Sequence, residues 1–180
     1  GEQSVAERQT EVCAEYVLPH TNEPFDEFIR QEFKSFEQPN MKFYKMSNMC
    51  KALYVAVQHL LTQSDLEEVE PRRRAIVLAN SAASLDADAD HQRIANQHAP
   101  EGTSPAVFVY TLPNVAAGEM CIRHRLQGDN TFFVESDDSG LAEHYAHHLI
   151  ASDRADVAIC GWCDLLDKEY KVEVKLIKLK

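Results

Sequence analysis

The chain has 180 residues, of which 44% are hydrophobic and 26% charged, a composition typical of a globular protein. The length suits one hydrophobic core, so residues 1–180 are predicted to form a single domain. A formal net charge of −11 argues against binding to nucleic acid, which requires a basic surface. No apolar run approaches the roughly 20 residues that cross a membrane.

The N-terminal stretch GEQSVAERQTE is polar and acidic, unlike a secretory signal. The five cysteines are odd in number and lie mostly in apolar segments. We therefore expect reduced thiols and a cytoplasmic protein.

In chain order, residues 10–18 have the composition of a strand, and the spacing of apolar residues over 24–36 predicts a helix. Residues 47–63 predict a longer helix with Ser47 as its N-cap. This helix is apolar almost all round, so it requires burial on two sides. The run RAIVLANS (74–81) is typical of a buried parallel strand.

Residues 84–97 predict a helix, and Pro113 is expected to separate two helices within 104–126. A strand (130–135), a helix (140–152) and a buried strand (155–162) follow. Residues 170–180 alternate as a strand does, with a slip at Ile177 that predicts a bulge or a strand end. This order predicts an α/β fold whose sheet is mixed, mostly parallel, with helices on both faces.

Two short patterns resemble metal or redox sites and do not complete them. The acidic run 86–90 begins like a calcium loop, but His91 and Gln97 stand where that loop needs Gly and Glu. Cys160 and Cys163 form a CxxC pair without a second pair for zinc. We interpret the CxxC as the end of a strand with a tight glycine turn.

Two basic features have a plain and a functional interpretation. The run 72–74 contains three arginines, which suits either a solvated turn or a small site for an acidic partner. His144 and His148 are four residues apart on one predicted helix, a spacing that zinc can use. Glu143 and His147 flank them without forming HExxH, so solvent-exposed or partly buried histidines are the preferred interpretation.

The stretch TFFVESDDSGLAEHYAHH (131–148) runs from a strand into a helix, with Glu135, Asp137 and Asp138 at the joint. Such joints often carry the reactive group of an α/β protein, yet this one offers no obvious nucleophile. Ser139 and Gly140 supply only the last two positions of a GxSxG elbow.

Residues 113–140, PNVAAGEMCIRHRLQGDNTFFVESDDSG, resemble the segment before and around the active site of the β-ketoacyl-acyl-carrier-protein synthases, in the thiolase-like superfamily. That family has a helix of the form PN…A…IA-I-R…L-x-G-P-N, then a strand, then T-A-C-A-S-G. The order and spacing are kept by Pro113, Asn114, Ile122, Arg123, Leu126, Gly128 and Asn130, and then by Ser139 and Gly140. Residues 43–61 resemble the family's first long helix, and ADVAICGWCD resembles its strand after the active-site helix. The resemblance covers roughly residues 40 to 165.

The resemblance implies the fold of a thiolase-like half and places the nucleophilic Cys of the family at Asp137. An Asp there can cap the helix by accepting backbone N–H bonds, but its acyl derivative would be a mixed anhydride instead of a stable thioester. The family's catalytic His residues, and usually a Lys, come from a C-terminal half that this sequence lacks. Condensation is therefore not expected.

We expect instead a degenerate, non-condensing partner or acyl-binding subunit in a fatty-acid or polyene-type pathway. Its binding residues would be Asp137, Asp138, Ser139, Gly140 and Asn114, with no cofactor and no metal. The expected partners are an acyl carrier protein or an active ketosynthase. The resemblance also implies a homodimer or heterodimer that pairs near 130–135.

The alternative is an enzyme of changed chemistry. Asp137 and Asp138, with Glu135 and His144, would form an acid–base or metal site, since clustered carboxylates raise one another's pKa. In either case, half of a duplicated fold leaves one face of its sheet to cover. We predict that residues 170–180 or a homodimer cover it.

Overall fold

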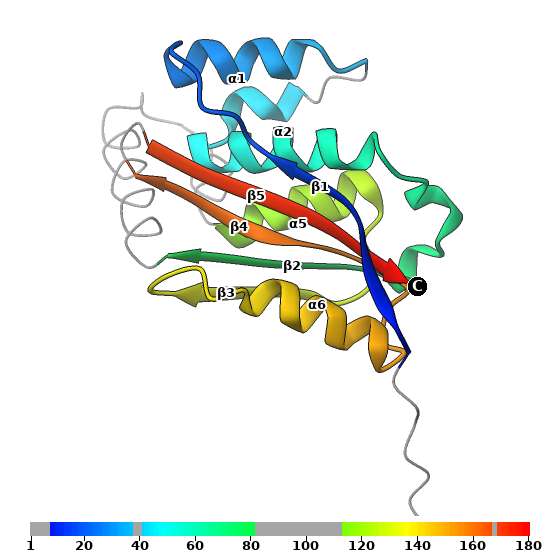
Figure 1. Cartoon of the computed structure of the whole chain (residues 1–180). Coiled ribbons are helices and arrows are strands. Elements are labelled where there is room, and N and C mark those ends of the chain that lie inside the picture. The colour runs from blue at the N-terminus through cyan, green and yellow to red at the C-terminus, as the bar shows by residue number, and fades with distance from the viewer. Residues whose placement is uncertain (1–7, 38–40, 82–112, 167–168) are drawn as a thin grey trace, which may run out of the picture.

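A computed structural model describes residues 8–37, 41–81, 113–166 and 169–180. At its centre lies a five-stranded sheet of order β1-β5-β4-β2-β3 (Figure 1). The strands are β1 (Thr10–Val17), β2 (Arg74–Ser81), β3 (Asn130–Glu135), β4 (Val157–Leu166) and β5 (Glu169–Leu179).

The pairing of the strands confirms a mixed sheet and corrects its balance. β2 runs parallel to β3 and to β4, whereas β5 runs antiparallel to β4 and to β1. Parallel pairing is thus confined to the three strands β3, β2 and β4, and the sheet is not mostly parallel. The cause is the short connection between β4 and β5, which can join only antiparallel neighbours.

Helices cover both faces of the sheet, as predicted (Figure 1). One face carries α2 (Asn48–Leu61) and α5 (Pro113–His124), with α1 (Phe25–Lys34) outside α2, and the other carries α6 (Leu141–Ala151). Three 3₁₀ turns complete the described elements, namely η1 (Met41–Lys45), η2 (Leu66–Glu68) and η3 (Pro71–Arg73).

The two most apolar segments lie where the sequence places them. Ser47 caps α2, with its Oγ accepting a hydrogen bond from the Cys50 backbone N at 3.2 Å. Nine residues of α2 are buried, because the helix lies between the sheet and α1. Every residue of β2 is buried, because this strand has a neighbour on each side and helices above and below.

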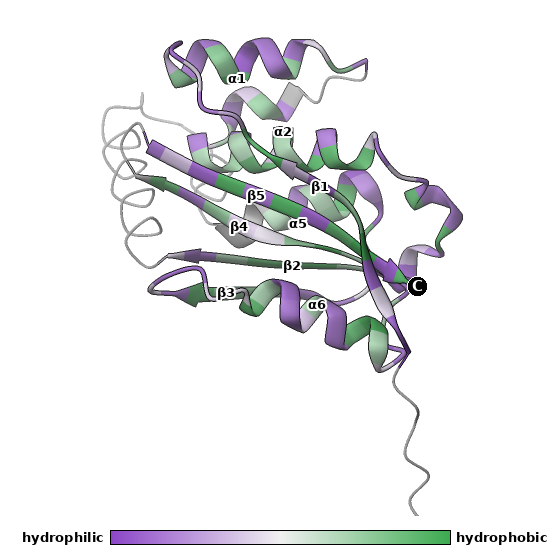
Figure 2. Ribbon diagram, in the orientation of Figure 1, coloured by the Kyte–Doolittle hydropathy of each residue, from purple (hydrophilic) through white to green (hydrophobic). Residues whose placement is uncertain are grey.

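The C-terminal strand alternates as predicted, and Figure 2 shows the alternation of polar and apolar residues along β5. Ile177 is not a strand end, but the predicted irregularity is confirmed there, because the register of β5 with β1 shifts between Ile177 and Leu176, which lie opposite Val12 and Ala14. Ile177 lies opposite Ala158 in unbroken register with β4 and belongs to the cluster under α6. The register shift lies in β1, between Val12 and Ala14.

β5 is a member of the sheet, so the prediction that residues 170–180 cover one of its faces is wrong. α6 packs on the face opposite α2, through the cluster that holds Ala146, Leu149 and Ile150. The predicted helix 84–97, the acidic run 86–90 and the segment 104–112 lie outside the described residues.

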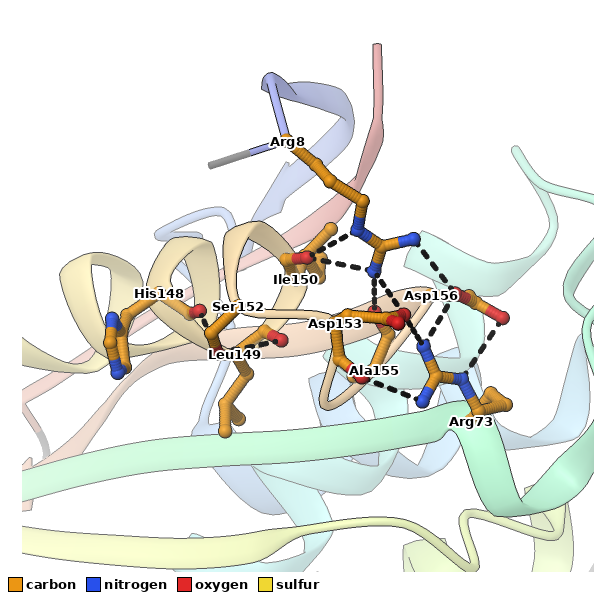
Figure 3. Close-up of polar contacts among 9 residues, drawn as sticks. All are labelled: Arg8, Arg73, His148, Leu149, Ile150, Ser152, Asp153, Ala155 and Asp156. Atoms are coloured by element: carbon orange, nitrogen blue, oxygen red, sulfur yellow. Dashed lines mark hydrogen bonds and ion pairs between the residues drawn. The ribbon is translucent and has the colours of Figure 1, made fainter. Parts of the chain in front are cut away.

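The C-terminal end of α6 is fixed by a network of charges (Figure 3). Arg73 contacts Asp153 at 2.6 Å and Asp156 at 2.9 Å, and it holds the pKa of Asp156 below its usual value through a hydrogen bond. Arg8 donates to the carbonyl oxygens of Ile150 and Ala155. The middle arginine of 72–74 is therefore structural, and it is not available to an acidic partner.

Candidate functional site

The candidate site lies at the carboxyl ends of β2, β3 and β4, where the chain leaves β3 for α6. The strand order reverses at β2, and crevices at such reversals are where open α/β sheets bind ligands. The ends of β2 and β4 carry a hydrogen-bonded polar cluster of Asn80, Ser81 and Asp164. The Ser81 backbone N donates to Asp164 Oδ1 at 2.9 Å, and Asn80 Nδ2 donates to the Cys163 carbonyl oxygen at 2.5 Å.

Sequence analysis missed this polar cluster. Asn80 and Ser81 were part of an apolar run, and Asp164 followed a strand that was expected to end at residue 162. The polar ending of RAIVLANS was the available indication, because a fully buried strand rarely ends in polar residues without partners for them.

The loop from β3 to α6 brings together two pairs of the predicted residues. Ser139 Oγ donates a short hydrogen bond to Glu135 Oε1. The Gly140 backbone N donates to Asp138 Oδ1 at 3.0 Å. Gly140 has a φ of 80°, a left-handed conformation that favours glycine. Asp137 is exposed, and its side chain has no hydrogen bond or ion pair within the described residues.

The prediction that Asp137 caps α6 is wrong. Gly140 is the N-cap, and no side chain caps the helix. The carboxylate that accepts a backbone hydrogen bond belongs to Asp138, one residue later in the loop. Asp137 and Asp138 still lie near the positive end of the helix dipole, which favours negative charge.

Two other predicted residues do not join this loop. Asn114 lies in the first turn of α5, and its side chain is not among those described. His144 is exposed and lines, with His147 and His148, a separate surface pocket of about 620 Å³. In the described ranges, no hydrogen bond or ion pair connects His144 with Asp137, and no group of three His, Cys, Asp or Glu side chains could hold a metal ion.

The cysteines do not supply a substitute nucleophile at the loop. Cys160 and Cys163 lie inside β4, not at a turn, which corrects the prediction for the CxxC pair. They belong to the core clusters on opposite faces of the sheet, so they cannot form a disulfide or share a metal ion. Burial raises the pKa of Cys160 to about 12 and that of Cys121 to about 11, so both remain thiols at neutral pH.

A small cavity of about 70 Å³ lies between the start of α6 and strands β4 and β5, with Asp138 and Trp162 in its lining. Lys175 Nζ and Glu143 Oε1 form an ion pair of 2.7 Å across it, and this hydrogen bond raises the pKa of Lys175. The amine is therefore charged and paired, so it does not act as a free base. The site presents carboxylates and a serine without an imidazole to activate it.

The fold of this chain is similar to that of solved ketosynthases and chain length factors. A chain of the complex of a type II polyketide synthase acyl carrier protein with its ketosynthase (AntDE:AntF) has a TM-score of 0.68 at 14% identity, over 97% of this chain and 63% of that one. The ishigamide ketosynthase/chain length factor gives 0.64 at 16% identity, over 94% and 62%. The ketosynthase in complex with its chain length factor from Xenorhabdus doucetiae gives 0.65 at 12%, over 96% and 79%.

The family follows from the sequence match. Residues 19–173 match the model of the β-ketoacyl synthase N-terminal domain, and the chain belongs to that family. The match is wider than the 40–165 that the motifs predicted. The chain spans less than two thirds of the length of the first two similar structures. No curated protein sequence matches it significantly, and no described helix is long and apolar enough to cross a membrane.

The structure also explains one residue that carries the resemblance. Gly128 lies beside the first residue of β2, where its backbone N donates to the Arg74 carbonyl oxygen at 2.9 Å. A Cβ at this position would be 2.7 Å from that oxygen. Only glycine therefore lets the loop after α5 approach β2 so closely.

Proposed function

We propose that this chain is a non-condensing, ketosynthase-like subunit that binds an acyl carrier protein or pairs with an active ketosynthase. The observation that carries the proposal is Asp137. It stands where the family motif has its Cys, exposed on the loop before α6, and none of the five cysteines lies on that loop. A carboxylate there cannot store an acyl group as a thioester.

The proteins found in complex with the similar structures support this class of partner. One is a ketosynthase with its acyl carrier protein, and another is a ketosynthase with its chain length factor. By analogy, this subunit would shape or stabilise an acyl pocket while its partner performs condensation. A fatty-acid or polyene-type pathway is the proposed setting.

The edge of β3 is the proposed contact with a ketosynthase-type partner or a second copy. β3 is the last strand of the sheet within the described residues, and an edge strand presents unpaired backbone groups that can pair with another chain. Val134 on β3 is 51% exposed, and Ile122 on α5 is 71% exposed.

Acylation tests the absence of a nucleophile. The protein is incubated with malonyl- and acyl-loaded carrier protein, and its intact mass is measured beside a complex assay on the same sample. We expect a non-covalent complex without a gain of mass. Asp137→Cys is the matched variant, because it restores a thiol at the motif position and should gain acyl mass. An acyl adduct on the unchanged protein would overturn the proposal.

Pairing through β3 is tested with two substitutions of equal chemistry on opposite edges of the sheet. Val134→Lys places a charge on β3, and Val12→Lys places one on β1, where Val12 is 42% exposed. Co-purification with the candidate ketosynthase should be lost only for Val134→Lys. Equal loss in both variants, or no loss in either, would reject this edge as the interface.

A further inference from the structure

A large pocket lies at the opposite end of β2 from the candidate site. It has a volume of about 1010 Å³ and lies between the C-terminal ends of α2 and α5 and the turns that precede β2. Its lining includes Gln58, Asp65, Arg74, Arg123, His124 and Arg125. The length of β2, roughly 23 Å at the rise of a strand, separates it from the loop that holds Asp137.

Arg74 is a buried cation in this pocket without a carboxylate partner. Only 6% of its surface is exposed. Its Nε donates to the Val69 carbonyl oxygen at 2.8 Å, and its Nη1 donates to the His124 carbonyl oxygen at 3.0 Å. No salt bridge joins it to an acid in the part of the chain that the structure describes, whereas its neighbour Arg73 has two such partners. A buried charge is costly unless an opposite charge compensates it.

The guanidinium of Arg74 also has hydrogen-bond donors that these two bonds do not use. It carries five N–H groups, and its Nη2 takes part in none of the hydrogen bonds among the described residues. Two adjacent guanidinium nitrogens form a fork that matches the oxygens of a phosphate or a carboxylate. Arg74 is thus partly held by carbonyl oxygens and partly open to an oxyanion.

The pKa of His124 reflects the positive charges in this pocket. Its Nε2 is buried and has no hydrogen-bond partner within the described residues. Burial, followed by the charges of Arg123 and Arg74, lowers the pKa of His124 to about 4. The imidazole is therefore neutral beside the guanidinium groups of Arg123 and Arg74, and its Nε2 can hydrogen-bond to a ligand.

We propose that this pocket binds the oxyanion of a small ligand, a phosphate or carboxylate, through Arg74 with His124 as a second contact. The lining of the pocket is also acidic, because it includes Asp65, Glu67 and Glu68. These acids repel polyanions and attract a cation. The class of ligand that fits is a small phosphate ester or carboxylic acid whose other end is neutral or positively charged.

This inference is independent of the proposed function. It concerns the end of β2 opposite the loop that holds Asp137, and it requires neither a carrier protein nor a ketosynthase. A ligand bound there would stabilise the junction of α2, α5 and β2, since binding to the folded state alone raises its stability.

The first test is a titration with inorganic phosphate, followed by NMR of the His124 imidazole and by thermal unfolding. Phosphate should shift the His124 resonances and raise its pKa by offsetting the positive charge. Arg74→Gln removes the charge and keeps an amide donor, and it should weaken binding at least tenfold. Arg72→Gln is the matched control, because Arg72 is exposed and does not line the pocket.

If Arg74→Gln does not fold, Arg125→Gln replaces it, since Arg125 is exposed and lines the same pocket. That variant should weaken phosphate binding at least threefold. Unchanged His124 resonances in saturating phosphate would overturn the proposal. Equal weakening by Arg72→Gln would also overturn it, because binding would then follow net charge and not this pocket.

Phosphoethanolamine distinguishes a site for free phosphate from a site for phosphate esters. A free-phosphate site should bind it no better than inorganic phosphate. A site for esters with a cationic end should bind it at least threefold more tightly, and Asp65→Asn should remove that preference. Binding of neither compound would overturn the proposal.

Discussion

His124 should make the stability of this protein fall as the pH is lowered from 6.5 to 4. Its pKa is lowered from an ordinary 6.5 to about 4 by burial and by Arg123 and Arg74. Between these values the unfolded chain binds a proton that the folded chain does not bind. Stability therefore decreases with decreasing pH in this window. The loss is about 2 kcal/mol at pH 5 and approaches about 3 kcal/mol below pH 4.

Urea unfolding at several pH values in phosphate-free buffer measures this loss. His124→Gln should remove most of it, because an amide of similar polarity does not titrate. Asp156 and other carboxylates titrate in both proteins, so the difference between the two pH profiles isolates His124. If both proteins lose stability in parallel between pH 6.5 and 4, the reasoning about the pocket charge is refuted.

The remaining predictions concern packing, capping and thiol access. Gly161→Ala should lower the free energy of unfolding by about 3 kcal/mol, because its Cβ would lie 2.1 Å from the Glu173 carbonyl oxygen. Gly118→Ala, with nothing within 4 Å, should raise it by up to about 1 kcal/mol; the same sign for both would contradict this argument. Ser47→Ala should cost about 1 kcal/mol in the same urea assay, and no change would mean that the cap bond is dispensable. Alkylation followed by peptide mapping should modify Cys13 first, since it is the exposed cysteine of the five; earlier modification of another cysteine would contradict the burial pattern.

Local patterns were enough for the elements and for the family. The fully apolar run of β2, the N-cap of α2 and the period of β5 each follow from side chains that are near one another in sequence. The residues that carry the ketosynthase resemblance are also local, and Gly128 shows why. The loop can approach the backbone of β2 only if residue 128 has no Cβ. This requirement selects glycine, which is recognisable in the sequence.

The errors arose where distant segments decide the outcome. The sequence placed an irregularity at Ile177, but it did not show that the extra residue lies in the partner strand β1. The CxxC pair looked like a turn until β5 was placed against β4, where Gly161 admits the neighbouring backbone. Asp137 looked like a cap until Gly140 was seen to occupy the N-cap position.

The sequence by itself predicted the family and the strands and helices that the structure describes, because each depends on residue type and short spacing. Only the tertiary structure decided the direction of β5, the polar cluster at the ends of β2 and β4 and the surroundings of Arg74. These depend on which segments meet. Among the described residues, Arg74 is buried without an acidic partner and its neighbour Arg73 is paired with two acids, because the fold brings different chain segments to each.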